Sequence, residues 1–481
     1  MFHKRFFKSL LLFFLFFGIA TCTSTKPLIK NTVLSSTTNL PLTNSTNADS
    51  QLKIWWNQGF LPEENEFITQ IVDEWKQQNN IDVELSLIAD RNINQETRKA
   101  IDAGKTPDIV FNFTGDLNLF PRLAWENKLA DVSELIEPIK DSYLKSALEA
   151  VSYQNNVTNK RSYYAVPLAQ QALHTSYWKD LLEEAGLGNV EIPKEWDAFW
   201  TFWKEAQDTL HQKGQEDIYG LGLVMSSLGA DTFWQFEHFL EAYNVELIDK
   251  SGQLRLDAPG IEEGITTALD QFTRFYKDGY VPPDSVDWTD SGNNVALLDR
   301  HVIMTANPSV SIPLTQKQDE ENIYNKLSTD LYFNKMATTE LPNKPNKEPM
   351  RYLISVKQVV LFENSTNKDV AKKFLSYLLE PDNLNRFLKE ANKGRIFPVM
   401  PELLKDSFWN NPSDPHLFVA AKQYKQPVRP FYPVLNPAYV EVQSQNIWAK
   451  AILSILQKGA SPEQAADQAI AQIKQIFAEW K

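Results

Sequence analysis

The chain of 481 residues holds a single cysteine, Cys22, so no disulfide bond can form within it. Its six histidines are scattered, and no His-Glu-x-x-His helix, glycine-rich phosphate loop or Gly-x-Ser-x-Gly elbow occurs. The sequence therefore gives no support for a metal site, a cofactor site or a serine nucleophile. Adjacent acidic pairs such as Glu183 and Glu184 are expected to be solvated, so they do not indicate a glycosidase.

The chain also lacks an excess of basic charge, with 48 Lys and Arg residues against 61 Asp and Glu residues. The formal net charge is -13 and the pI is about 5.1, which excludes a broad attraction to nucleic acid or to anionic lipid. Apolar residues make up 43% of the chain, and at this length they suffice for two sizeable cores. We therefore expect a protein of two lobes without a nucleic-acid partner.

Long apolar runs are missing as well. The run from Leu10 to Ala20 follows a basic segment and is too short to span a bilayer, but it fits the apolar region of a signal peptide. Residues 19–22 resemble a bacterial lipobox, although Thr21 departs from the usual small residues. We expect residues 1–21 to be a signal peptide and Cys22 to be lipidated; a cysteine by chance in an ordinary cleaved signal is the alternative.

A polar segment follows this cysteine. Ser, Thr and Asn account for 16 of the 28 residues from Thr23 to Ser50, and no apolar period is sustained. Such a stretch cannot bury enough surface to offset its chain entropy. We interpret residues 22–50 as the lipidated cysteine and a flexible tether.

Beyond residue 50, β-prone and helical patterns alternate. Apolar strand-like runs occupy residues 53–56, 81–88 and 108–111, and Phe67, Ile71 and Trp75 recur at helical spacing between the first two. Strands that bracket helices predict an α/β fold with a parallel sheet. Near the other end of the chain, Ser461 and Gln464 form a capping-box pattern that predicts the start of a helix.

Several segments in order resemble one family. These are KIWWNQG, AGKTPDIVFNFTGD, YYAVPLAQQALHTSYWKDLLEEAGL and IPKEWDAFWTFWKEA, followed by YKDGYVPPD, LLDRHVIMTANPS, DVAKKFLSYLLEPDNLNRFLKEA and GRIFPVMPEL. In this order and spacing the chain resembles the carbohydrate-type family 1 extracellular solute-binding proteins of bacterial ABC importers, which include the maltose-binding protein. The resemblance covers nearly everything after residue 50.

The resemblance implies a fold of two discontinuous α/β lobes joined by a hinge, the periplasmic binding protein type II fold. The implied lobes are residues 51–168 plus 355–396 and residues 169–354 plus 397–481. The chain would cross between them near Val166 to Gln170, near Tyr352 to Lys357 and near Arg395 to Val399.

The implied function is a receptor without enzyme activity. It would capture a sugar or polyol between the lobes, close, and deliver it to the permease subunits of an ABC importer. It would be a monomer held by its lipid anchor at the periplasmic face of the bacterial cell membrane.

The 13 tryptophans suit sugar recognition, because aromatic faces stack on the C–H faces of sugars. Those at helical spacing are expected in the core: Trp75, Trp196, Trp200, Trp203 and Trp448.

Candidate ligand contacts of the first lobe follow two strands at their carboxyl ends, where ligands bind in open α/β sheets. Trp56 and Asn57 end the first strand, with Trp56 expected to face the cleft. Asn112, Thr114 and Asp116 follow the strand at 108–111 and would bind hydroxyl groups; turn chemistry is the alternative explanation for them.

Candidates of the second lobe are Trp234, Trp288 and Asn307. Trp234 is the first choice for stacking, although its helix could bury it. Asn307 begins an Asn-Pro-Ser turn where similar proteins supply an aromatic residue, and this departure puts their substrate in doubt.

Two candidates lie near the expected crossings, Gln170 and Arg395. Arg395 resembles the hinge arginine of glycerol-3-phosphate receptors, so a phosphorylated polyol is the alternative ligand. A salt bridge is the other explanation for this arginine. At the level of protein class, the alternatives are an exported carbohydrate-active enzyme and a lipid-anchored adhesion or sensor protein.

Overall fold

The computed structural model describes residues 51–317 and 330–480. The expected signal peptide, the lipidation at Cys22 and the tether all lie outside the described residues. Within these two ranges, no helix combines the length and apolarity required to cross a membrane.

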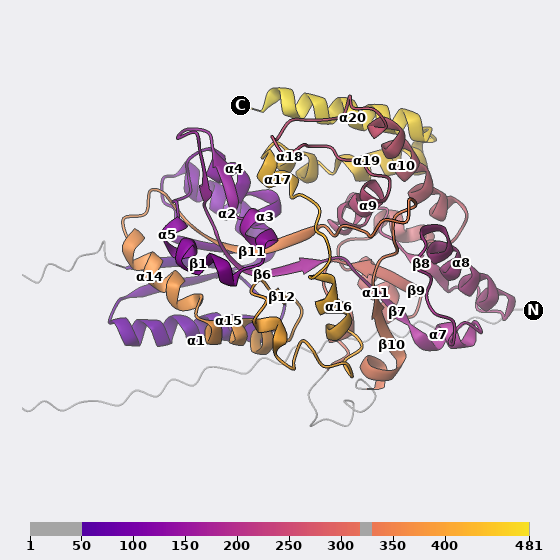
Figure 1. Cartoon of the computed structure of the whole chain (residues 1–481), viewed down its shortest axis with the longest axis horizontal. Coiled ribbons are helices and arrows are strands. Elements are labelled where there is room, and N and C mark those ends of the chain that lie inside the picture. The colour runs from indigo at the N-terminus through magenta and orange to yellow at the C-terminus, as the bar shows by residue number, and fades with distance from the viewer. Residues whose placement is uncertain (1–50, 318–329, 481) are drawn as a thin grey trace, which may run out of the picture. The chain divides into compact units, whose positions relative to one another are not determined.

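The first of two larger sheets has the strand order β12-β6-β11-β3-β1-β2 (Figure 1). Its strands are β1 (Leu52–Asn57), β2 (Val83–Ile88), β3 (Ile109–Asn112), β6 (Val166–Ala172), β11 (Ile354–Leu361) and β12 (Phe397–Pro398). Strand β1 runs parallel to β2 and β3, whereas β11 is antiparallel to β3 and β6. The carboxyl ends of β1, β2 and β3 therefore meet the start of β11 at one edge of the sheet.

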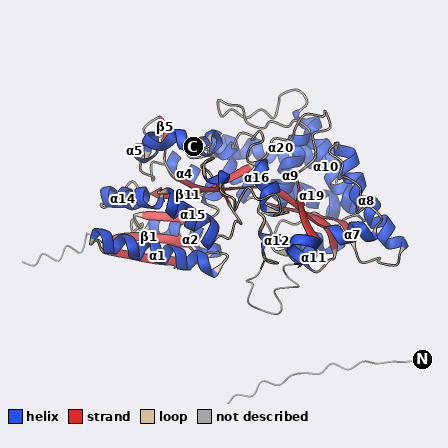
Figure 2. Cartoon of the chain, turned by 60° about the horizontal axis from the view of Figure 1, so that its bottom comes forward, coloured by secondary structure: helices blue, strands red, loops and turns tan. Residues whose placement is uncertain are grey.

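Helices flank the strands of this sheet (Figure 2). They are α1 (Pro62–Asn79), α2 (Asp90–Asp102), α3 (Gly115–Asn118), α4 (Phe120–Trp125), α5 (Ser133–Ile136), α6 (Lys145–Glu149), α14 (Lys368–Leu378) and α15 (Pro381–Asn385). Helix α1 buries the predicted stripe of Phe67, Ile71 and Trp75, and the Trp75 ring meets Phe374 of α14 edge-on at 5.4 Å between ring centroids. A hairpin of β4 (Ser152–Asn155) and β5 (Lys160–Tyr163) stands apart from the sheet.

The second sheet has the order β10-β7-β9-β8. Its strands are β7 (His174–Trp178), β8 (Tyr219–Gly222), β9 (Val302–Asn307) and β10 (Met336–Thr339). Its helices and those of the C-terminal region are α7 (Lys179–Glu184), α8 (Trp196–Gln212), α9 (Asp231–Ala242), α10 (Ile261–Lys277), α11 (Gly292–Leu298), α12 (Ser311–Leu314), α16 (Leu417–Gln423), α17 (Tyr432–Leu435), α18 (Tyr439–Ser444), α19 (Ile447–Lys458) and α20 (Pro462–Glu479). Short 3₁₀ or π turns occupy Glu137–Ser142, Pro283–Asp287, Leu331–Lys335, Arg386–Ala391 and Leu403–Lys405.

Two predictions about side chains are confirmed. All five tryptophans that were expected in the core are buried. Ser461 caps α20, with its hydroxyl oxygen accepting from the backbone N–H of Gln464 and the Gln464 side chain accepting from the N–H of Ser461.

The chain passes between the two sheets through short segments. Only Leu173 separates β6 from β7. Tyr352, just before β11, lies beside the segment 427–429. Its N–H donates to the carbonyl of Pro427 and its carbonyl accepts from the N–H of Arg429, each at 2.9 Å. The predicted fold class, two α/β lobes joined at connecting segments, is confirmed, while the residue boundaries of the lobes stay a prediction.

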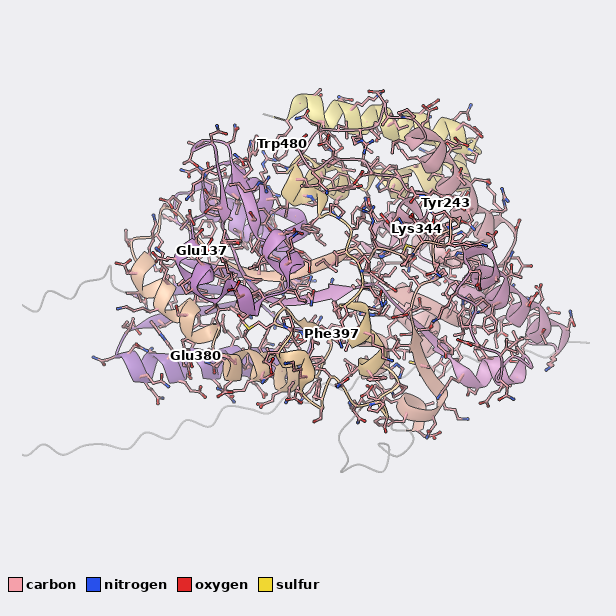
Figure 3. All side chains as sticks on the ribbon, viewed as in Figure 1. Glu137, Tyr243, Lys344, Glu380, Phe397 and Trp480 are labelled. Carbon is pink, nitrogen blue, oxygen red and sulfur yellow. The ribbon has the colours of Figure 1, made fainter. Side chains whose placement is uncertain are left out.

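Buried ion pairs fix helix α9 to these connecting segments. Glu237 pairs with Arg429, and both side chains are almost fully buried. One turn later, Glu241 pairs with Arg351 at 2.7 Å and with Lys344, which Figure 3 labels, at 2.5 Å. Helix α9 is thus bonded to Arg351, which precedes β11, and to Arg429, which lies beside Tyr352.

Three buried histidines predict a loss of stability in mild acid. Burial lowers the pKa of His174, His238 and His416 to about 4. Between pH 6.5 and 4 the unfolded chain therefore binds protons that the folded chain does not, and the free energy of unfolding falls as the pH falls. Each histidine should cost roughly 1–2 kcal/mol at pH 5.

Urea unfolding of His416→Asn at pH 7 and pH 5 would measure this contribution, since the variant should lose less stability between the two pH values than the wild type. The control is His211→Gln, at a position that is not buried. A drop in His416→Asn as large as that of the wild type would contradict the prediction.

Candidate functional site

A cavity of about 460 Å³ lies at the edge of the first sheet where β1, β2 and β3 end. Its lining residues come from the loop after β1, the start of α1, the start of α2, the end of β3 and the segment before β12: Asn57, Gln58, Gly59, Phe60, Glu64, Asp90, Phe111, Phe113 and Arg395. The volume suits a small molecule of the size of a sugar.

An ion pair forms one wall of this cavity. Nη2 of Arg395 donates to both carboxylate oxygens of Glu64, at 2.8 and 3.0 Å, and to Oδ1 of Asn392 at 3.1 Å. Both side chains of the pair are only 7% exposed. Glu64 also accepts the N–H of Leu61 at the start of α1, so one carboxylate fixes both the helix and the arginine.

Two phenylalanine rings flank the guanidinium of Arg395. Its Cζ lies 5.2 Å from the ring centroid of Phe60 and 4.7 Å from that of Phe113. Phe60 is 59% exposed, so much of its ring is open to contact with a solute. The loop reaches this place because Gly59 has no β-carbon, and a β-carbon there would overlap that of Glu64.

Polar groups complete the lining. Asn57 is buried, with its Oδ1 accepting from Phe113 N–H at 3.1 Å and its Nδ2 donating to Gln58 at 2.8 Å. Burial raises the pKa of the Asp90 carboxyl, although Asn57 and Lys357 oppose the shift. The charge of Asp290, in the loop before α11, raises it further.

Of the predicted ligand contacts, Asn57 and Arg395 line this cavity. The expected orientation of Trp56 is wrong: its ring is 2% exposed and stacks on Phe111, with the ring centroids 4.3 Å apart. It packs in the core because successive strand residues point to opposite faces, and the other face carries Trp55.

The predicted group after β3 makes turn contacts. Asn112 is buried, its Nδ2 donates to Asn94, and its Oδ1 accepts from Thr114 N–H and Oγ1. Asp116 is buried and accepts from Ser355 and from the N–H of Val356. These residues do not line the cavity, and their role in binding stays a prediction.

The remaining candidates are mostly engaged within the protein. Gln170 donates to the carbonyl of Pro398 at 2.7 Å, Nε1 of Trp288 donates to Asp284 at 3.0 Å, and Asn307 donates to Ser309 and Ser311. Trp234 is 2% exposed on α9, in agreement with the alternative that its helix buries it. None of these residues is among those that line the cavity, and their binding roles likewise stay predictions.

Sequence reasoning missed Phe60, Glu64, Asp90 and Phe113. Asp90 carried a usable signal, because it lies at the carboxyl end of the second strand as Asn57 lies at that of the first. Glu64 carried none, since its partner Arg395 is 331 residues away in the chain. Across residues 51–317 and 330–480, no group of three or more His, Cys, Asp or Glu side chains could hold a metal ion.

Two α/β lobes, short connecting segments and a cavity at the strand ends define a two-lobed solute-binding fold. Residues 70–419 match the model of the bacterial extracellular solute-binding protein family, and the chain belongs to that family. Binding proteins of Brucella abortus strain 2308 and of Brucella suis biovar 1 strain 1330 are each 26% identical over 315 residues, covering 65% of this chain and 68% of the relative.

Solved structures share the fold. A solute-binding protein of an ABC transporter from Thermotoga lettingae, bound with α-D-tagatose, has a TM-score of 0.69 at 20% identity and covers 89% of this chain and 100% of its own. A cyclic α-maltosyl-1,6-maltose binding protein from Arthrobacter globiformis has a TM-score of 0.68 at 19% identity, covering 89% and 99%. The family and these neighbours are binding proteins rather than enzymes.

The ion pair in the cavity wall predicts a large difference between two adjacent glutamates. Glu64→Gln should lower the free energy of unfolding by about 3 kcal/mol, because it leaves a buried guanidinium without its counter-ion. Glu63→Gln should change it by less than about 1 kcal/mol, since Glu63 meets Lys393 at 3.7 Å and both side chains are exposed, at 41% and 47%. Urea unfolding of the two variants at pH 7 measures the difference, and equal losses would contradict the assignment.

Proposed function

We propose that this protein binds a neutral sugar or sugar-like solute in the cavity beside Phe60 and Arg395, and that it delivers the solute to the permease of an ABC importer. The observation that carries the proposal is the exposed ring of Phe60 at the strand ends, which lines one cavity with the Asp90 carboxylate and the Asn57 amide. The binding of tagatose by the Thermotoga lettingae protein and of a cyclic maltosaccharide by the Arthrobacter globiformis protein supports a carbohydrate.

Each group of the cavity has a partner on a sugar. The ring of Phe60 offers an apolar face for the C–H groups of a pyranose or furanose. The carboxylate of Asp90 accepts hydrogen bonds from hydroxyl groups. The Arg395 guanidinium donates to hydroxyl oxygens along the edge that Glu64 does not occupy.

The same ion pair argues against the phosphorylated alternative. Glu64 neutralises Arg395, and Asp90 adds a negative charge to the lining. A glycerol phosphate would bring about two negative charges to a site whose one lining cation is already paired. A neutral polyol or sugar meets no such penalty.

Closure of the lobes would complete the site. Asp290, which accepts the N–H of Ala230 at the start of α9, is a carboxylate whose charge raises the pKa of Asp90. Two like charges repel across the cleft unless a solute donates hydrogen bonds to them. A solute rich in hydroxyl groups therefore favours the closed form, which the permease would recognise.

Export and anchoring belong to the same proposal. A family of extracellular proteins fits the signal peptide expected at residues 1–21. We infer that Cys22 is acylated, that the following polar segment serves as the tether, and that the receptor acts as a monomer at the periplasmic face of the membrane. Growth of cells with radiolabelled palmitate should label the full chain and leave Cys22→Ala unlabelled.

A thermal-shift screen of residues 51–481 tests the ligand class. Tagatose, maltose, glucose, glycerol and glycerol 3-phosphate would be added in turn at pH 7. We expect at least one neutral sugar to raise the melting temperature and glycerol 3-phosphate to leave it unchanged. A response to glycerol 3-phosphate alone would contradict the proposal, and turnover of a glycoside would favour the exported enzyme.

Phe60→Ala should weaken the binding of the best sugar about tenfold, because the apolar face that it stacks on is lost. Isothermal titration calorimetry gives the dissociation constant. Phe418→Ala is the matched control, since this half-buried ring on α16 does not line the cavity. Equal affinities of the two variants would show that Phe60 is not a contact.

A further inference from the structure

A buried lysine lies behind the cavity without lining it. Lys357 is 1% exposed on β11, the strand between β6 and β3. The register of β11 against β6 shifts between Lys357 and Gln358, opposite a β-bulge in which Leu168 of β6 is the extra residue. Such bulges redirect side chains and are common beside functional sites.

The ammonium group of Lys357 bonds to the loop that follows β3. Nζ donates to the carbonyl oxygen of Phe113 and to Oγ of Ser355, both at 2.8 Å. It also lies 3.9 Å from the centroid of the Phe113 ring, a cation–π contact. Ser355 in turn donates to Oδ2 of Asp116 at 2.6 Å, so β11 holds both ends of the loop from Phe113 to Asp116.

Burial at this position is unfavourable for the positive charge of Lys357. Burial lowers the pKa of Lys357 to about 8, with the positive charge of Arg395 acting in the same direction and the charges of Asp116 and Asp90 acting against it. Burial likewise raises the pKa of Asp116. A methionine would fill similar space without desolvating a cation, so packing alone does not account for a lysine here.

We propose that Lys357 is a positioning residue of the solute cavity, whose ammonium group orders the loop from Phe113 to Asp116 so that Phe113 stays beside Arg395. The link to solute binding rests on the proposed function. The ordering of the loop does not, because it can be measured without any solute.

The proposal predicts opposite effects of alkaline pH on the loop and on the whole fold. Above pH 8 the folded protein loses the Lys357 proton while the unfolded chain keeps it up to about pH 10.4. In that window the unfolded state binds more protons, so this group makes the fold more stable as the pH rises. The loop from Phe113 to Asp116, in contrast, should become less ordered, because the carbonyl and the ring of Phe113 then face a neutral amine in place of the ammonium group.

Hydrogen–deuterium exchange of the solute-free wild type from pH 6.5 to 9.5, corrected for the intrinsic rate, tests the loop directly. Amides in peptides that span residues 112–118 should exchange about tenfold faster at pH 9.5 than at pH 6.5, while peptides from α9 should not change. Lys357→Met should show the fast exchange at every pH, and Lys357→Arg, which keeps the cation, should remove the pH dependence.

Lys344→Met is the matched control, because Lys344 is also a buried lysine but pairs with Glu241 in the second lobe. It should leave exchange of residues 112–118 unchanged. Exchange that is independent of pH in the wild type, or equal changes in the two methionine variants, would overturn the proposal.

Binding of maltose or of the best sugar of the screen separates two claims, that Lys357 orders the loop and that the ordered loop supports solute binding. If the wild type binds and its affinity falls about tenfold between pH 7 and 9.5, with Lys357→Arg retaining affinity, the positioning role is supported. If the loop responds as expected but no sugar binds, the proposed function fails and the ordering role of Lys357 stands. If a sugar binds equally at both pH values, Lys357 does not position the cavity.

Discussion

The pairing of Arg395 with Glu64 determines the character of the cavity. It joins the start of α1 to the segment before β12, and it holds a cation between the rings of Phe60 and Phe113. A free arginine would have made an anion site. Because the charge is already matched, the wall offers donors and aromatic surface without attracting phosphate, which is consistent with the neutral solute proposed above.

The predictable part of the site followed from strand direction. Asn57 is predictable because polar residues at the end of a strand gather at its carboxyl end, and Arg395 because it resembles the hinge arginine of glycerol-3-phosphate receptors. The choice between Trp55 and Trp56 failed because neighbouring strand residues differ only in the face they occupy, and two adjacent tryptophans carry no pattern that distinguishes the faces. The alternation of strands and helices and the helix at Ser461 rest on local periodicity and capping, which one sequence displays directly, whereas the two discontinuous lobes were implied by the family resemblance.

Other features depended on contacts between distant segments. Asn112, Thr114 and Asp116 have the composition of a ligand loop, yet they bond to Asn94, to one another and to β11. Glu64 and Lys357 acquire their roles only when α1 and β11 reach the same edge of the sheet. No spacing along the chain encodes such encounters, so buried polar residues were the hardest to interpret.

The shared hydrogen bonds of Tyr352 with Pro427 and Arg429 have a mechanical consequence. One bridge joins two of the connecting segments, so sliding either segment along the other would break backbone hydrogen bonds. Bending the two segments together would keep both bonds. The lobe closure proposed above therefore requires no bond between these segments to break.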